Sequence, residues 1–577
     1  MKHISDKDHT INKRLHRLYT PEIAGRAVDS IIDLIFKYKS RIQSKEYPLS
    51  EKDVILITYG DQVNKDHEAS LQTLKGFMDR HLKGVINSVH ILPFYPYSSD
   101  DGFSVVNYGA VDPKMGSWKE IEQISGDYRL MVDGVINHIS QFSDWFKAFL
   151  DGDPYFQDFF TEVDPSIDLT QVIRPRALPL LSEYVDNKGK IRYVWTTFSR
   201  DQVDLNYKSH RVLRNVLDAL FYYVEKGATL IRLDAIAFIW KEIGTECVHL
   251  DQTHELIQLM REVLHEVAPE VIIITETNVP HHENVSYFGS GDDEAQMVYN
   301  FALPPLLVHS ILNENTTTLT RWAKTLVLPS DKVCFFNFTA SHDGIGLRPV
   351  KGILTDNEVQ YLGNTVKEHG GLVSYKTDAD GSKSPYELNC SYIDALTHPN
   401  ETDEVRYKRM FLAQATVLVM PGVPGIYFHS LVGSRNYHDG VKHSGLNRTI
   451  NREKYNIDWL EKELETQGTL AKKMLDNYKR LISIRINEAA FNPFGKFEFL
   501  DLGPSIFAVD QHCIHKKERV IAIHNFSDKE VECVLPETIP LPLHNVLALN
   551  SLIELNQKSS LIKLEPYQML WLKGKSR

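Results

Sequence analysis

The stretch HRVLRNVLDALFYYVEKGATLIRLDAIAF, residues 210–238, contains the pattern on which the fold prediction depends. Between residues 212 and 224 apolar residues recur every three or four positions, which predicts a helix with one apolar face. The short apolar run 229–233 then predicts a buried strand that leads directly into Asp234. A helix followed by a buried strand is the repeating unit of a parallel sheet.

The same alternation extends along most of the chain. Further apolar runs predict strands at 54–59, 89–92, 130–136, 271–275, 297–301, 333–336 and 425–428. Eight such strands separated by helical segments favour the α/β class and a closed (β/α)8 TIM barrel. We expect the barrel to occupy residues 51–490.

Four regions depart from the barrel pattern. Residues 1–50 predict an amphipathic N-terminal helical extension. About 90 residues separate the third and fourth strands, too many for an ordinary crossover, so we expect an inserted subdomain at about 139–205. Residues 350–400 are interpreted as an acceptor loop region. Residues 491–577 contain short apolar runs with Pro and Gly breaks, which predicts a C-terminal antiparallel β domain.

The composition limits the classes of partner. The 577 residues are 42% hydrophobic and 24% charged, as in ordinary globular proteins. The net charge of −12 argues against nucleic acid and anionic membranes as partners, and favours small molecules. Five scattered cysteines and an N-terminus without an apolar segment predict a reducing cytoplasm, with neither secretion nor membrane insertion.

Polar residues gather where the predicted strands end. The residues concerned are Asp133, Asn137 and His138 on the third strand, Arg232 and Asp234 on the fourth, Glu276 on the fifth, and His342 and Asp343 after the seventh. In a TIM barrel these ends meet at one face, where the active site is built. Burying so many charges would be costly without a function. A purely structural Arg232–Asp234 ion pair remains the alternative.

The order of these acids resembles glycoside hydrolase family 13, the α-amylase superfamily. Motifs similar to its sucrose phosphorylase branch are LITYGDQ (56–62), HILPFYPYSSDDGF (90–103), IRPRALP (173–179), FALPPLL (301–307), SHDGIG (341–346), PGVPGIY (421–427) and INR (450–452). The resemblance covers about 54–490 and implies a retaining glycoside phosphorylase. By this resemblance Asp234 matches the nucleophile, Glu276 the general acid/base and Asp343 the acid that stabilises the transition state.

The residues themselves suit these roles. Retaining chemistry needs one ionised carboxylate and a second, protonated one about 5 Å away. Arg232 precedes Asp234 by two residues and points to the same side of the strand, so we expect it to lower the pKa of Asp234. Glu276 follows four apolar or hydroxyl residues, and desolvation there is expected to raise its pKa.

The resemblance also implies how the substrates are bound. His138 and His342 would donate hydrogen bonds to sugar hydroxyls, and Asp100 and Arg452 would hold the far end of one glucosyl unit. Phe103 and Phe238 match apolar platforms for the sugar, although either phenylalanine alone is more often a core residue. Arg176 matches the phosphate-binding arginine, and Tyr386 would shape that pocket. A solvated basic turn is the alternative for the Arg176 loop.

The acceptor segments differ from the sucrose-type pattern. Thr277-Asn278-Val279-Pro280 replaces Val-His after the acid/base, and residues 384–389 read SPYELN. With residues 289–301 and the N-terminal extension, they look more like the subgroup acting on glucosylglycerate and glucosylglycerol. Asn278, Tyr386 and Glu387 are the candidate acceptor residues. Glu387 would repel a carboxylate if it faced the acceptor, which leans toward glycerol, but the choice stays open.

No metal or cofactor is expected, with inorganic phosphate as the co-substrate. His281, His282 and Glu283 lack further ligands at diagnostic spacing and predict a polar loop. Asn137 matches a calcium ligand of amylases, but the phosphorylase branch is not known for needing calcium. The alternatives are a sucrose or sucrose 6′-phosphate phosphorylase, an α-glucosidase or transglucosylase, and an inactive binding protein. A homodimer is left open.

Overall fold

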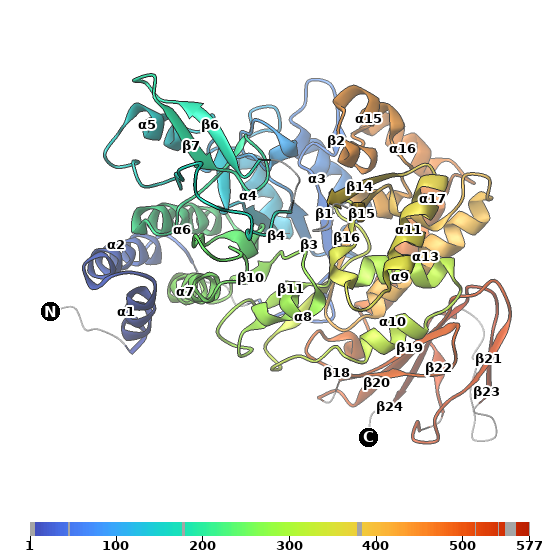
Figure 1. Cartoon of the computed structure of the whole chain (residues 1–577). Coiled ribbons are helices and arrows are strands. Elements are labelled where there is room, and N and C mark those ends of the chain that lie inside the picture. The colour runs from blue at the N-terminus through green and yellow to red at the C-terminus, as the bar shows by residue number, and fades with distance from the viewer. Residues whose placement is uncertain are drawn as a thin grey trace.

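Eight parallel strands form a closed barrel, around which the rest of the chain is arranged (Figure 1). The computed structural model describes residues 6–43, 47–175, 179–377, 383–513, 515–540, 542–548 and 561–575. The barrel strands are β1 (Ile55–Thr58), β3 (Ser88–Ile91), β4 (Arg129–Gly134), β9 (Ala228–Leu233), β10 (Ile272–Thr275), β11 (Met297–Tyr299), β12 (Cys334–Asn337) and β16 (Val423–Tyr427). Each pairs with the next along the chain, and β16 pairs with β1 to close the ring. The predicted TIM barrel is confirmed.

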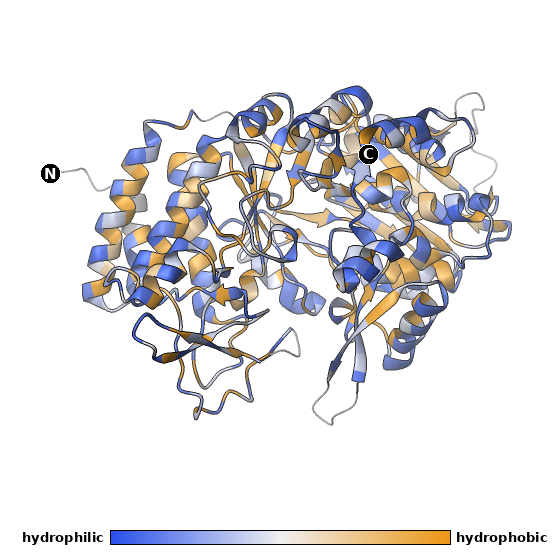
Figure 2. Ribbon diagram, turned by 90° about the horizontal axis from the view of Figure 1, so that it is seen from above, coloured by the Kyte–Doolittle hydropathy of each residue, from blue (hydrophilic) through white to orange (hydrophobic). Residues whose placement is uncertain are grey.

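Helices pack around the outside of this barrel. The principal ones are α3 (Ser70–His81), α4 (Trp118–Asp127), α6 (His210–Glu225), α7 (Asp251–Val267), α9 (Leu303–Leu312), α13 (Asp403–Val419) and α17 (Leu470–Arg485). All the apolar positions predicted for one face of α6 are buried. Figure 2 shows the apolar residues concentrated on the inner strands and on the helix faces that turn toward them. This burial of one stripe per helix fixes the layers of the barrel.

The N-terminal region contains two helices, α1 (Asp6–Leu18) and α2 (Pro21–Lys39). Arg14 of α1 reaches α7, where its guanidinium lies 3.0 Å from Glu255 and 2.7 Å from Glu262. Tyr38 of α2 stacks on Phe221 of α6 with ring centroids 5.1 Å apart. The helical extension therefore packs against the outer helices of the barrel.

Between β4 and α6 the chain forms a small antiparallel region. It contains β5 (His138–Ser140), α5 (Asp144–Asp151), β6 (Leu181–Val185), β7 (Ile191–Trp195) and β8 (Gln202–Asp204). β5 pairs with β8, and β6 pairs with β7 across a turn at residues 186–189. Gly189 adopts a φ of 78°, a conformation that glycine reaches without steric cost.

The region expected to be an acceptor loop has regular structure instead. It contains α11 (Asp356–Glu368), β14 (Leu372–Thr377) and β15 (Lys383–Asn389), and it follows β13 (Ile345–Gly346) and the short helix η4 (Arg348–Val350). The three strands form an antiparallel sheet in the order β13-β15-β14. The sheet therefore gives this part of the chain a fixed position beside the barrel.

The C-terminal part is an antiparallel β domain, as predicted. Its five-stranded sheet contains β18 (Lys496–Leu500), β19 (Ile506–Cys513), β20 (Glu518–Asn525), β24 (Met569–Lys575) and β22 (His544–Asn545). A second sheet pairs β21 (Val531–Val534) with β23 (Leu561–Leu564). Across the described part of the chain, none of the helices combines the length and the hydrophobicity that crossing a bilayer requires.

Candidate active site

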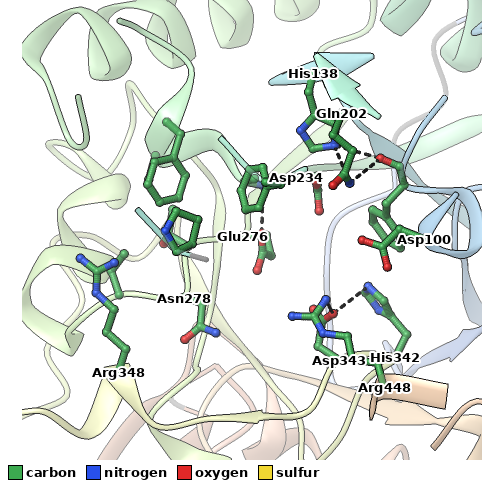
Figure 3. Close-up of a pocket in the computed structure, with 18 of the residues that line it drawn as sticks. Asp100, His138, Gln202, Asp234, Glu276, Asn278, His342, Asp343, Arg348 and Arg448 are labelled. Carbon is green, nitrogen blue, oxygen red and sulfur yellow. Dashed lines mark hydrogen bonds and ion pairs between the residues drawn. The ribbon is translucent and has the colours of Figure 1, made fainter. Parts of the chain in front are cut away.

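A cavity lies where the barrel strands end (Figure 3). Predicted site residues that line it are Asp100, Phe103, His138, Asp234, Phe238, Glu276, Asn278, His342, Asp343 and Tyr386. Lining residues that the sequence did not single out include Phe198, Gln202, Arg348 and Arg448. The structure thus brings together side chains that are separated by up to about 350 residues in the sequence.

Arg232 of β9 connects the acids at the floor of this cavity. Its Nη1 donates to Asp234 Oδ1 at 2.9 Å and also to Asp133 of the neighbouring β4, which lies opposite it in register. Its Nη2 lies 3.8 Å from Glu276 Oε2. His90 of β3 holds the other oxygen of Asp133 at 2.7 Å. One buried guanidinium is therefore shared by three carboxyl groups.

Burial raises the pKa of both Asp234 and Glu276 to about 7, and Arg232 opposes this rise. The predicted rise for Glu276 is confirmed. The expectation that Arg232 would hold the pKa of Asp234 low is wrong, because desolvation outweighs a guanidinium charge that Asp133 shares. Arg232 is nonetheless closer to Asp234, at 2.9 Å, than to Glu276, at 3.8 Å. The negative charge is therefore more stable on Asp234, and the proton on Glu276.

The residue after Asp234 fixes the position of Glu276. Ala235 adopts a φ of 49°, which ends β9 abruptly in a left-handed turn. Its N–H donates to Glu276 Oε2 at 2.9 Å. A strained turn at a strand end thus links the two carboxyl groups.

Asp343 is in a more cationic environment. Its carboxylate forms an ion pair with Arg448 and lies 3.5 Å from His342 Nε2 and 3.8 Å from Arg452 Nη2. Although burial acts to raise it, these groups hold the pKa of Asp343 far below its usual range. Burial lowers the pKa of His342 to about 3, so its ring is neutral at pH 7. That ring stacks on Phe103, with centroids 4.5 Å apart.

Arg448 also binds Glu387, and this changes the interpretation of the acceptor site. Arg448, from the short helix η5 (Asn447–Asn451), donates through Nε and Nη2 to the two carboxylate oxygens of Glu387 at 3.0 and 2.7 Å. Asn389 donates to Glu387 Oε1 at 2.6 Å. Within the described residues Glu387 is buried and is not part of the cavity wall. The lean toward glycerol, which assumed that its carboxylate faces the acceptor, therefore loses its support.

Arg452 lies behind the cavity wall. Its Nε donates to the backbone oxygen of His342 at 2.7 Å, and its Nη1 donates to Asp101 at 2.8 Å and lies 3.6 Å from Asp100. Within the described residues it is not among those that line the cavity. Arg452 thus holds together two segments that carry predicted glucosyl contacts.

The ring of His138 is held from behind the cavity. Its Nε2 lies 2.9 Å from the backbone oxygen of Phe103, to which Gln202 Nε2 also donates at 3.1 Å. Burial lowers the pKa of His138, so the ring is neutral. The predicted hydrogen bond to a sugar hydroxyl would compete with this contact to Phe103.

Other predicted positions lie around the cavity. Arg176 lies outside the described residues, but Pro175 before it lines the cavity. Asn137 accepts a hydrogen bond from Lys241 Nζ at 2.9 Å, and the same ammonium group lies 2.7 Å from Asp204. The segment with two histidines forms the short helix α8 (His281–Asn284). In the part of the chain that the structure covers, no cluster of three or more His, Cys, Asp or Glu side chains has an arrangement that would hold a metal ion.

Comparison with known proteins agrees with this geometry. Residues 60–334 match the alpha amylase catalytic domain. The chain is 46% identical over 529 residues to a glucosylglycerate phosphorylase of Spirochaeta thermophila, covering 90% of both proteins. The chain belongs to the α-amylase family. A second relative, a glucosylglycerol phosphorylase of Marinobacter adhaerens, is 30% identical over 466 residues, covering 78% of this chain and 90% of that protein.

A solved structure shows the same fold. The crystal structure of sucrose 6F-phosphate phosphorylase from Thermoanaerobacter thermosaccharolyticum superposes with a TM-score of 0.72 at 23% identity. The match covers 82% of this chain and 94% of that one. At this identity the similarity supports the fold alone.

Proposed function

We propose that this chain is a retaining glucoside phosphorylase. It transfers a glucosyl unit from a small α-glucoside of a three-carbon acceptor, glucosylglycerate or glucosylglycerol, to phosphate and gives α-D-glucose 1-phosphate. One observation carries the proposal. The acids of a retaining mechanism converge on one cavity, in a chain that is 46% identical to a glucosylglycerate phosphorylase over 90% of its length.

The first half-reaction uses both carboxyl groups that Arg232 contacts. Ionised Asp234 attacks the anomeric carbon and forms a β-glucosyl ester. Protonated Glu276 gives its proton to the glycosidic oxygen, so that the acceptor leaves as a neutral alcohol. Arg232, at 2.9 Å from Asp234, favours the ionised nucleophile over the ionised acid.

The second half-reaction reverses these roles. A phosphate oxygen attacks the anomeric carbon while Glu276 takes its proton, and the ester bond to Asp234 breaks. Two inversions give α-D-glucose 1-phosphate, with net retention. No metal or organic cofactor takes part in either step of this proposal.

The remaining cavity residues would bind the glucosyl unit. Ionised Asp343 is suited to bind sugar hydroxyls and to stabilise positive charge that develops at the anomeric centre. The stacked rings of Phe103 and His342 offer an apolar face and a neutral N–H donor. Asp100, His138 and Phe238 line the same cavity and complete the proposed glucosyl site.

Phosphate must compete with water for the glucosyl ester. We assign Arg176 to the incoming phosphate, because a guanidinium group binds two phosphate oxygens at once. The neighbouring Pro175 and the proposed partner Tyr386 both line the cavity, which supports this assignment. The cytoplasmic location of the protein remains a prediction from the sequence, and the homodimer remains open.

Product partitioning tests the proposal. Wild-type protein with glucosylglycerate and saturating phosphate should give mainly α-D-glucose 1-phosphate and little glucose. Arg176→Ala removes a charge-assisted contact of roughly 1.5–3 kcal/mol, so the phosphate requirement should rise at least about tenfold. Free glucose should then increase relative to glucose 1-phosphate. A wild-type protein that releases mainly glucose at saturating phosphate would instead be an α-glucosidase.

A further inference from the structure

The cavity has two ends on either side of Glu276. Figure 3 shows Asp100 and His342 on one side and Arg348 on the other, with Glu276 and Asn278 between them. A general acid protonates the oxygen that joins the glucosyl unit to the acceptor, so it lies between the two binding sites. If the Asp100 and His342 side holds the glucosyl unit, Arg348 belongs to the acceptor end.

Two arginines line the cavity within the described residues, and they differ in their partners. Arg448 is fully engaged by the carboxylates of Glu387 and Asp343. Among the residues that the structure describes, Arg348 forms only a long ion pair, in which its Nη2 lies 4.0 Å from Glu283 Oε2. His249 Nε2 lies closer to the same Glu283 oxygen, at 3.0 Å, but neither of these two atoms has a hydrogen-bond partner among the described residues. Arg348 thus retains donors for an anion in the cavity.

Asn278 adds a polar group near the same end. Its Oδ1 is buried and has no hydrogen-bond partner among the described residues. A buried carbonyl oxygen without a donor is unfavourable, and because Asn278 lines the cavity, a turn of its side-chain amide would bring this oxygen to a hydroxyl group of a bound ligand. A guanidinium and a free carbonyl oxygen together suit a molecule with a carboxylate and a hydroxyl group.

We propose that Arg348 binds the carboxylate of the three-carbon acceptor, with Asn278 accepting from one of its hydroxyls, so that this site selects glycerate over glycerol. This inference rests on the proposed phosphorylase function. A planar guanidinium matches a carboxylate through two parallel hydrogen bonds, and an uncharged glycerol offers no such partner. Because Glu387 is buried in an ion pair with Arg448 and does not line the cavity within the described residues, its carboxylate does not face a carboxylate at this end.

The test measures transfer from α-D-glucose 1-phosphate to glycerate and to glycerol by phosphate release. Arg348→Gln should lower the ratio of kcat/KM for glycerate to kcat/KM for glycerol by roughly ten- to a hundredfold, as expected for losing hydrogen bonds to a charged group. Using a ratio within one variant cancels any loss of folded protein. Arg348→Lys keeps the positive charge but loses the two parallel donors of the guanidinium group. Its glycerate-to-glycerol ratio of kcat/KM should fall less than that of Arg348→Gln.

Lys351→Gln is the matched control. Lys351 is exposed three residues along the chain, and within the described residues it lines a neighbouring hollow and not this cavity. The glycerate-to-glycerol ratio of kcat/KM for Lys351→Gln should stay within about twofold of the wild-type value. An equal loss in Lys351→Gln would show a diffuse charge effect and overturn the proposal.

The remaining outcomes separate the two proposals. Wild-type protein that transfers to neither acceptor would refute the phosphorylase function itself. Wild-type protein that transfers to both but prefers glycerol, or Arg348→Gln that keeps the glycerate preference, would refute only the role of Arg348. A variant whose phosphate requirement rises at least tenfold while the glycerate preference is unchanged would make Arg348 a phosphate residue and would also overturn the inference.

Discussion

The protonation of Glu276 is the step of the proposed mechanism that pH should control most directly. Burial raises the pKa of this group from 4.5 to about 7. At pH 7 an ordinary glutamic acid is protonated in about one molecule in 300, whereas a group with this pKa is protonated in about half. The buried site therefore increases the competent acid roughly 150-fold, a difference of about 3 kcal/mol between the two protonation states.

The perturbations are pH and Glu276→Gln. With the natural glucoside, the glucosylation rate of wild-type protein should fall about tenfold per pH unit above about pH 7, because the leaving alkoxide needs a proton. With α-glucosyl fluoride, whose leaving group needs little protonation, this fall should disappear. Glu276→Gln should accordingly lose much more activity with the natural glucoside than with the fluoride.

The assay is pre-steady-state release of acceptor or fluoride between about pH 6 and pH 9. Glu465→Gln, at an exposed position at the end of α16 (Ile457–Glu465), serves as the matched control and should follow the wild-type profiles. Equal losses with both donors would refute the reasoning. So would a natural-donor profile without a descending limb.

The same pKa also affects folding stability. The unfolded chain loses the Glu276 proton near pH 4.5, whereas the folded chain keeps it until about pH 7. The free energy of unfolding should therefore fall as pH rises through this window and level off above it. Glu276→Gln should weaken this dependence in urea unfolding at about pH 5 and pH 8; Asp234 contributes in the same direction.

Three further predictions concern other residues. Asp234→Asn should keep the fold and reduce turnover by several orders of magnitude, so a variant with a tenth of the wild-type activity would contradict its role as nucleophile. Arg448→Met leaves Glu387 buried and unpaired and should destabilise the protein by about 3–5 kcal/mol. Adding Glu387→Met should recover part of that loss, whereas additive losses in urea unfolding would argue against the pairing. Arg14→Met should lower the unfolding free energy by about 1–3 kcal/mol with unchanged kcat, and a reduced kcat would mean that α1 affects the site.

The barrel was predictable because its strands are buried on both faces. Each appears in the sequence as a short apolar run without alternation, and the helices between them carry one apolar stripe. The β14–β15 pair has no such signal, and Pro385 within β15 argues against a strand when the sequence is taken alone. Helix α11 does have a signal in the sequence, because Thr355 and Glu358 have the spacing of the capping box that they form at its start.

Asp234 and Glu276 were predictable because they directly follow strands, and Asp343 because it lies in the loop after β12. Arg348 and Arg448 come from short helical turns, where no periodic pattern fixes the direction of a side chain. Arg448 and Glu387 are 61 residues apart, so their pairing depends on the tertiary structure. The pKa of Asp234 was mispredicted because burial raises it by more than Arg232 lowers it, and because Asp133 of the neighbouring strand also binds Arg232.

The position of Arg232 has a consequence for how charge moves during the proposed reaction. When Asp234 becomes an ester, it loses its negative charge. In the same half-reaction Glu276 gives up its proton and acquires a negative charge. Arg232 contacts both groups, at 2.9 and 3.8 Å, so it is the counter-ion of whichever carboxylate is ionised. Each half-reaction therefore moves one negative charge from one side of a fixed positive charge to the other, and it adds no further anion to the buried cavity while phosphate is present.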